Sequence, residues 1–262
     1  MNTDYNTAGA PGIRSIPQQR VIAKMDEYMS RRDYAGAERH LLYWQEEARQ
    51  GGDLRGELLV ANELIGHYRK TGERNKALNA IETALRLLEE LDFGGTISAG
   101  TTYVNAATAL NAFGENERAL ALFEKARAVY ESGADTEPRL LGGLYNNMAL
   151  ACVSLERYDE AAALYDMAMA QMGRAENGAL EQAITCQNMA NLVEARDGME
   201  RGEQDIFALM DRAAALLADP AVPRDGYYAF VCEKCAPTFE YYGYFAEAER
   251  LNGEAKRIYA GT

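Results

Sequence analysis

Two cysteines three residues apart, Cys232 and Cys235, form the motif CEKC, which could carry redox or metal chemistry. A CxxC pair can cycle between a dithiol and a disulfide, or it can supply half of the ligands of a structural zinc site. The sequence has no second CxxC, and its two histidines, His40 and His67, do not form a ligand pair. The helical repeat described below also places both cysteines at apolar positions, where cysteine behaves as a small buried hydrophobe. We therefore predict that the pair is structural and that no metal is bound.

The sequence motifs of common enzyme sites are absent. There is no HExxH, GxGxxG, GxxxxGK[ST] or GxSxG pattern in the chain. The glycines of GGDLRG, residues 51–56, are predicted to link two helices rather than to cradle a phosphate. Carboxylates are numerous, but most lie at exposed helical spacings. These observations predict a protein that is not an enzyme and that needs no cofactor.

The composition of the chain limits which binding partners and which cellular compartment we expect. The chain has 262 residues and a formal charge of −13, and an acidic surface repels phosphate backbones. We therefore predict no binding to nucleic acid and a partner that is neutral or basic. No apolar stretch approaches the roughly 20 residues of a membrane span, and no secretory signal is recognisable. Four cysteines make no disulfide framework, so we expect a cytoplasmic protein.

A repeat of about 42 residues organises most of the chain. Gly72, Gly114 and Glu156 follow one another at intervals of 42 residues, and Ala77 and Ala119 keep the same interval. Each unit contains a first amphipathic segment, a short polar turn and a second amphipathic segment. Neither segment can bury its apolar stripe alone, so a stack of such pairs is the predicted solution.

The second segments share a pattern of small, large and small residues at helical spacing. Ala119, Phe123 and Ala126 illustrate it, and Ala161 with Tyr165 begins the next copy. Spacings of three and four residues place such side chains on one helical face. The first segments carry a less strict pattern, in which an aromatic residue is followed by small and apolar residues. Its copies are Tyr103, Ala106, Ala107 and Leu110, then Tyr145, Met148, Ala149 and Cys152, then Cys186, Met189, Ala190 and Val193.

These patterns resemble the tetratricopeptide repeat, in the long variety seen in kinesin light chains and bacterial peptide-sensing regulators. The resemblance implies an all-α fold, a right-handed superhelical solenoid of about six antiparallel helix pairs. We predict a flexible tail over residues 1–15 and a single solenoid domain over residues 16–262. In the fifth unit, a longer turn between the helices is expected. The predicted units are 16–52, 53–94, 95–136, 137–178, 179–220 and 221–262.

In such a stack the first helices line the concave side, and polar residues beside their packed stripe face a groove. An asparagine amide can pair with both the C=O and the N–H group of an extended peptide. The alternative is that these amides bond to the adjacent helix and set the stacking. The candidate binding residues are Asn62, Glu63, Arg69, Asn105, Thr108, Asn111, Asn146, Asn147, Gln187, Asn188, Asn191 and Glu194.

The predicted function is a non-catalytic interaction module that binds a peptide or protein segment in this groove. The alternative is a regulatory sensor of a small signalling peptide, which acts on an effector protein without a DNA-binding head. Eight aromatic residues lie between Tyr227 and Phe245 in the last unit. Aromatic residues at helical spacing usually belong to a core, and the alternative is a docking face for a second copy.

Overall fold

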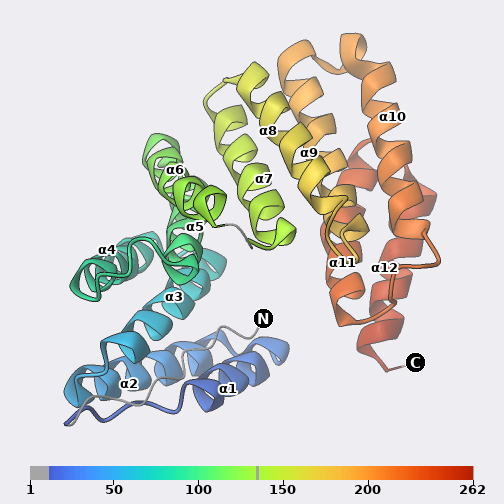
Figure 1. Ribbon diagram of the computed structural model, residues 1–262. Coiled ribbons are helices and arrows are strands. Elements are labelled where there is room, and N and C mark those ends of the chain that lie inside the picture. The colour runs from blue at the N-terminus through green and yellow to red at the C-terminus, as the bar shows by residue number, and fades with distance from the viewer. Residues whose placement is uncertain (1–11, 134–135, 262) are drawn as a thin grey trace. The chain divides into compact units, whose positions relative to one another are not determined.

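The computed structural model describes residues 12–133 and 136–261. Within these residues every regular element is an α-helix and no strand occurs, so the predicted all-α class is confirmed (Figure 1). Contacts divide the chain into two compact units, which we call unit 1 (Met1–Ala134) and unit 2 (Asp135–Thr262). Each unit is described by itself. That residues 16–262 form a single domain stays a prediction.

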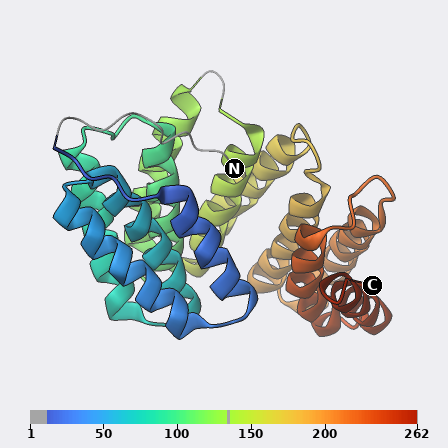
Figure 2. The ribbon, with the colours of Figure 1, turned by 90° about the horizontal axis from the view of Figure 1, so that it is seen from below.

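The described residues of unit 1 form three pairs of consecutive helices. They are α1 Gln18–Ser30, α2 Tyr34–Gly51, α3 Leu54–Thr71, α4 Arg74–Glu90, α5 Ile97–Ala112 and α6 Asn116–Ser132. The two helices of each pair pack together, and neighbouring pairs are joined by contacts of α3 with α2 and α5 and of α4 with α5. Figure 2 shows the pairs following one another in chain order, from blue to green. We call α1, α3 and α5 the first helices of this unit.

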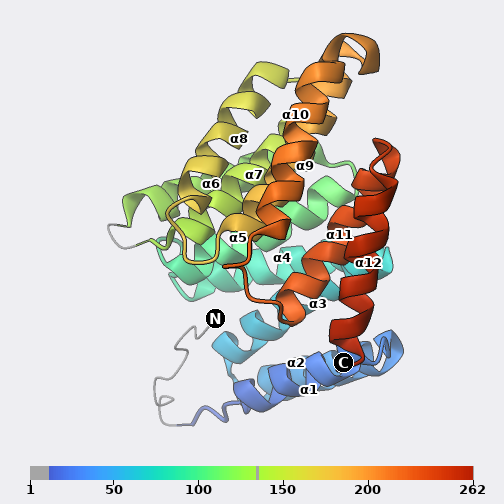
Figure 3. The same cartoon turned by 90° about the vertical axis from the view of Figure 1, so that its right-hand side faces the viewer.

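Unit 2 repeats this plan over its described residues. Its helices are α7 Pro138–Ser154, α8 Tyr158–Met172, α9 Ala179–Asp197, α10 Met199–Ala218, α11 Gly226–Tyr241 and α12 Phe245–Tyr259. Consecutive helices again pack in pairs, and α9 contacts α7, α8 and α11 (Figure 3). The first helices of unit 2 are therefore α7, α9 and α11.

The small residues of the repeat are buried in the second helices of the pairs. Ala77, Ala119 and Ala161 are completely buried in α4, α6 and α8. The large residues four positions later, such as Phe123 and Tyr165, are also completely buried. A small side chain lets two helices come close, and the large neighbour fills the space beside it. The predicted pattern therefore describes the core of each pair.

The same turn ends five of the described first helices. In each, a residue in the left-handed conformation precedes an N–H group that donates to the carbonyl oxygen five residues earlier, at 2.8–2.9 Å. The left-handed residues are Arg32, Gly72, Gly114, Glu156 and Gly243, with φ of 56°, 75°, 79°, 58° and 83°. Glycine adopts this conformation without steric cost, whereas the Cβ of Glu156 opposes it. The 42-residue intervals between Gly72, Gly114 and Glu156 thus reflect a shared backbone turn.

The turn of the fifth pair differs from the prediction. We expected a longer turn, but α9 ends at Asp197 and α10 begins at Met199, so that Gly198 alone separates them. Gly198 has φ of 79° and ψ of 162°, whereas Gly72 at the end of α3 has φ of 75° and ψ of 17°. The additional residues of this unit lengthen α10, which reaches 20 residues. The prediction was wrong because polar residues that suit a turn also suit an exposed helical face.

Two aspartates cap helices in unit 1 but lie in different surroundings. Asp33 is exposed, and its carboxylate accepts the N–H of Gly36 at 2.8 Å. Asp53 is buried, and its two oxygens accept the N–H groups of Gly56 at 3.0 Å and Ile16 at 2.9 Å. Asp53 therefore satisfies both the start of α3 and the segment that precedes α1.

The segment before α1 contacts the end of α2. Residues 1–11 of the predicted tail lie outside the described residues. The N–H of Arg14 donates to the carbonyl of Gly51 at 2.9 Å, and its guanidinium lies 3.3 Å from Glu47. These contacts, with the bond at Ile16, place residues 14–16 against unit 1.

Candidate functional site

Two adjacent asparagines on α7, Asn146 and Asn147, have different surroundings. The Oδ1 atom of Asn146 accepts hydrogen bonds from Asn188 Nδ2 at 3.0 Å and from Thr185 Oγ1 at 3.3 Å, both on α9. The side chain of Asn147 is half-buried and forms no hydrogen bond with the described residues. One amide therefore joins two first helices, while its neighbour keeps its donors and acceptor available.

Unit 1 contains a similar group between α3 and α5, in which the asparagine donates to the threonine instead of accepting from it. Asn62 Oδ1 accepts from Asn105 Nδ2 at 3.2 Å, and Asn62 Nδ2 donates to Thr102 Oγ1 at 3.0 Å and to the carbonyl of Leu58 at 3.1 Å. We call these two Asn–Thr–Asn groups the interhelical clamps. Four candidate residues, namely Asn62, Asn105, Asn146 and Asn188, thus bond to a neighbouring helix, as the stacking alternative expects.

The threonines of the clamps were missed by sequence reasoning. Thr102 and Thr185 are each only 1% exposed. Each stands three residues before the clamp asparagine of its own helix, in TYVN and TCQN. A hydroxyl at this spacing lies one helical turn from the amide, so the repeated T-x-x-N pattern is the signal that could have revealed them.

Three other candidates on α9 are satisfied by α11. Gln187 is buried, and its Nε2 donates to the carbonyl of Cys235 at 3.1 Å. The hydroxyl of Tyr242, just after α11, lies 2.9 Å from Asn191 Oδ1 and 2.8 Å from Glu194 Oε2, so that its one hydrogen is shared between these two acceptors. Tyr241 reaches the other oxygen of Glu194 at 2.7 Å, and that bond raises the pKa of Tyr241. This end of α9 is covered by side chains of its own unit.

The remaining candidates keep unused polar groups. Arg69 is exposed at the end of α3, and Thr108 on α5 is half-buried and forms no side-chain hydrogen bond with the described residues. Near the end of α5, the Oδ1 atom of Asn111 is buried and has no partner among those residues. Asn147 and Glu63 belong to the same group of candidates, whose polar side chains are used neither by the interhelical clamps nor by contacts with α11.

The carboxylate of Glu63 on α3 is the most unusual of the open groups. It is half-buried and forms no hydrogen bond or ion pair with any described residue. Burial, and to a smaller extent the charge of Asp26 on α1, raise the pKa of Glu63. An ionised carboxylate in this position lacks the partner that would compensate for its lost hydration.

The cysteines are all free and buried. Burial raises the pKa of Cys186 and Cys232, and it raises the pKa of Cys235 to about 12. The thiolate is the form that reacts and binds metals, so burial disfavours the reactive form of these three thiols. Among the described residues, no cluster of three or more histidine, cysteine or acidic side chains could hold a metal ion.

His67 is buried in α3 between aromatic rings. Its ring centroid lies 5.4 Å from that of Tyr68 and 6.5 Å from that of Tyr34. The Nδ1 atom has no hydrogen-bond partner among the described residues, and burial lowers the pKa of His67. The fold therefore favours the neutral imidazole.

No helix in the described parts of the chain is long and apolar enough to span a membrane. Among curated proteins, none matches this chain significantly in sequence.

Comparison with known families and structures finds one matching family model and several similar solved structures. The family model described as "Tetratricopeptide repeat" matches residues 57–132. A kinesin light chain from Podosopora anserina with nearly identical TPR-like repeats has 17% identity and a TM-score of 0.52, over 77% of this chain and 94% of that chain. A variant of it has 17% identity and a TM-score of 0.54, over 77% and 93%. BtubC (BKLC) from P. vanneervenii has 19% identity and a TM-score of 0.49, over 94% and 92%.

Residues 57–132 therefore carry tetratricopeptide repeats, and the solved structures of kinesin-light-chain repeats share the fold of this chain, a TPR-like solenoid. The predicted resemblance to this repeat, in the variety seen in kinesin light chains, is confirmed. Tetratricopeptide repeats in general form modules for protein–protein interaction and are generally non-catalytic scaffolds.

Proposed function

We propose that this protein binds a neutral or basic peptide, or an extended segment of another protein, in a concave groove along its first helices. The observation that carries the proposal is Glu63, a half-buried carboxylate without a partner among the described residues. A charge kept in this state opposes folding, because hydration is lost and nothing replaces it. A lysine, an arginine or a peptide N–H from a partner would supply the missing interaction.

Asn147 supports the same role in unit 2. Its amide offers a donor pair and an acceptor, which match the C=O and N–H groups of an extended backbone. The neighbouring Asn146 shows that an asparagine on α7 can reach α9 when it is needed for stacking. Asn147 is therefore not required for that purpose and remains open to a partner.

The test is selection of binders from a displayed library of random peptides, with the full chain as the target. We expect enriched peptides that carry lysine or arginine. The variants Glu63→Gln and Asn147→Ala should weaken them, about tenfold for Glu63→Gln, since a hydrogen bond to a charged group contributes about 1.5–3 kcal/mol. Both variants should melt no lower than the unaltered protein.

Matched controls lie on α4, a second helix. Glu82 and Asn79 are exposed there, so Glu82→Gln and Asn79→Ala repeat the chemical changes away from the proposed groove. If no peptide is enriched, or if the α4 variants weaken binding as much as the variants of the first helices, the proposal fails.

Co-purification from the native host, followed by mapping of the bound segment, separates the two forms of this function. A large protein held through a flexible segment supports the scaffold. A short free peptide with nanomolar affinity supports the alternative, a sensor that passes the signal to an effector protein.

A further inference from the structure

The outer face of α12 carries a regular stripe of exposed side chains. Phe245, Glu249, Asn252, Lys256 and Tyr259 follow one another at alternating steps of four and three residues, which places them on one helical face. Phe245 is 67% exposed and Tyr259 is 55% exposed, although its hydroxyl lies 3.4 Å from Glu233 on α11. We call these five residues the α12 stripe.

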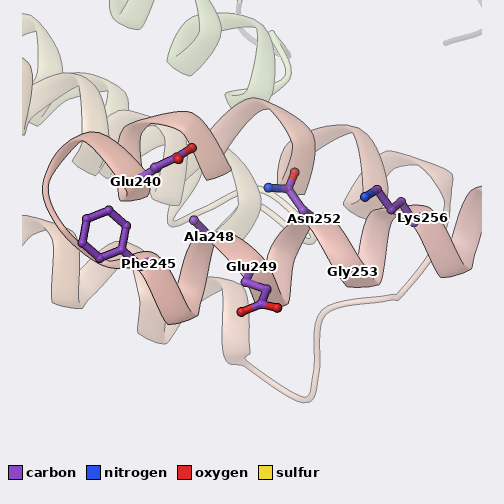
Figure 4. Close-up of a pocket in the computed structure, with 7 residues that line it drawn as sticks. All are labelled: Glu240, Phe245, Ala248, Glu249, Asn252, Gly253 and Lys256. Atoms are coloured by element: carbon purple, nitrogen blue, oxygen red, sulfur yellow. The ribbon is translucent and has the colours of Figure 1, made fainter.

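In the preceding pairs, the position of Asn252 is part of the core. The residues that match it in the repeat are large and buried, namely Ile81, Phe123, Tyr165 and Met210. Asn252 is exposed, and its polar amide replaces the apolar side chain that a following helix would cover. Around it lies a shallow hollow of about 460 Å³, whose lining includes Glu240 and Gly253. Figure 4 shows Phe245, Asn252 and Lys256 along the helix that borders this hollow.

The α12 stripe is complementary to itself when it is reversed. Asn252 stands at its centre, Glu249 and Lys256 stand on either side, and an aromatic ring closes each end. An antiparallel second copy would place Glu249 against Lys256 twice and Phe245 against Tyr259 twice. Contacts that recur in this way are the mark of an interface with two-fold symmetry.

We propose that α12 binds the α12 of a second copy of this chain, antiparallel, about a two-fold axis near Asn252. Glu249 and Lys256 form no ion pair with the described residues, so both charges are available. Two asparagine amides can exchange hydrogen bonds across the axis, since each has a donor and an acceptor. A Cβ atom at Gly253 would meet nothing within 4 Å, so the face is open at its centre.

This interface accounts for features that a solvated helix face does not need. A solvated face requires polar residues only, yet the stripe ends in exposed aromatic rings, which are favoured at interfaces. Opposite charges seven residues apart, on either side of a central amide, fix an antiparallel direction. Contact through α12 is separate from peptide binding by the first helices, and either can occur without the other.

Sedimentation equilibrium of the full chain, over a range of about 2 to 400 µM, tests the proposal. We expect a reversible monomer–dimer equilibrium. Lys256→Glu and Glu249→Lys should each weaken the dimer by roughly tenfold or more, because each turns two attractive pairs into repulsive ones. The double variant, with both changes, restores opposite charges and should regain the dimer.

The control for Lys256→Glu is Arg174→Glu, which makes the same change of net charge at an exposed residue between α8 and α9. It should leave the dimer unchanged. Monomers at every concentration would overturn the proposal, and so would a dimer that both single variants leave intact. A dimer that both single variants abolish and the double variant does not restore would exclude the antiparallel pairing.

Discussion

Replacing Asn146 with alanine removes the acceptor that α7 offers to α9. Two hydrogen bonds end on its Oδ1 atom, from Asn188 at 3.0 Å and from Thr185 at 3.3 Å. Each is worth roughly 1 kcal/mol net, for a loss of about 2 kcal/mol. Alanine returns about 0.5 kcal/mol through its better helix propensity. We therefore expect Asn146→Ala to lower the free energy of unfolding by about 1.5 kcal/mol.

The matched control is the next residue. Asn147→Ala makes the same chemical change on the same helix, but no hydrogen bond to a described residue is lost. Only the difference in helix propensity remains, so this variant should raise the free energy of unfolding by about 0.5 kcal/mol. The two neighbouring variants should thus differ by about 2 kcal/mol, with opposite signs.

Urea denaturation followed by circular dichroism at 222 nm measures this difference. With a slope of about 2 kcal/mol per molar, the midpoint of Asn146→Ala should fall by roughly 0.7 M. A double-mutant cycle of Asn146→Ala with Asn188→Ala should give a coupling energy of about 1 kcal/mol. Equal losses in the Asn146 and Asn147 variants, or a coupling energy near zero, would refute the assignment of the clamp.

Three further predictions concern stability in denaturant. Asp53→Ala should lower the free energy of unfolding by about 2–3 kcal/mol, because a helix cap and the partner of a buried N–H group are lost together. Asp33→Ala should lower it by about 1 kcal/mol, and equal losses in the two variants would contradict the double role of Asp53. Glu156→Gly should stabilise the fold by about 0.5–1 kcal/mol by relieving a left-handed residue, and Gly114→Ala should destabilise it by a similar amount; a loss for Glu156→Gly would disprove this reading of the turn. The pKa of His67 is lowered in the fold, so the unfolded chain binds the proton more readily and stability should fall as the pH drops below about 6.5. In His67→Leu this part of the pH dependence should disappear, and an unchanged profile between pH 7 and 5.5 would show that another group is responsible.

Much of the fold could be predicted from spacing along the chain. Ala77, Ala119 and Ala161 recur at 42 residues, and the structure buries all three in second helices. Helix formation and pairing depend on residues three, four and seven apart, which a sequence displays directly. The turn at Gly198 shows the limit, since polar residues leave the choice between turn and helix open.

The candidate site was less predictable than the fold. All twelve candidates lie on first helices, yet an amide such as Asn146 and an amide such as Asn147 look alike in the sequence. The partner of Asn146 lies 42 residues away on α9. Whether it is reached depends on how far α9 is shifted and rotated against α7.

The local sequence pattern therefore specifies the repeat, its helix pairs and the faces that the helices bury, because residues close together in the chain are sufficient to determine each of these features. The use of each polar side chain emerges only when the helices pack. Packing joins Asn62 to Asn105 and Asn146 to Asn188, covers Glu194 with tyrosines, and leaves Glu63 and Asn147 without partners among the described residues. Hydrogen bonds are short and directional, so the relative placement of two helices determines which amide holds the fold together and which remains for a partner.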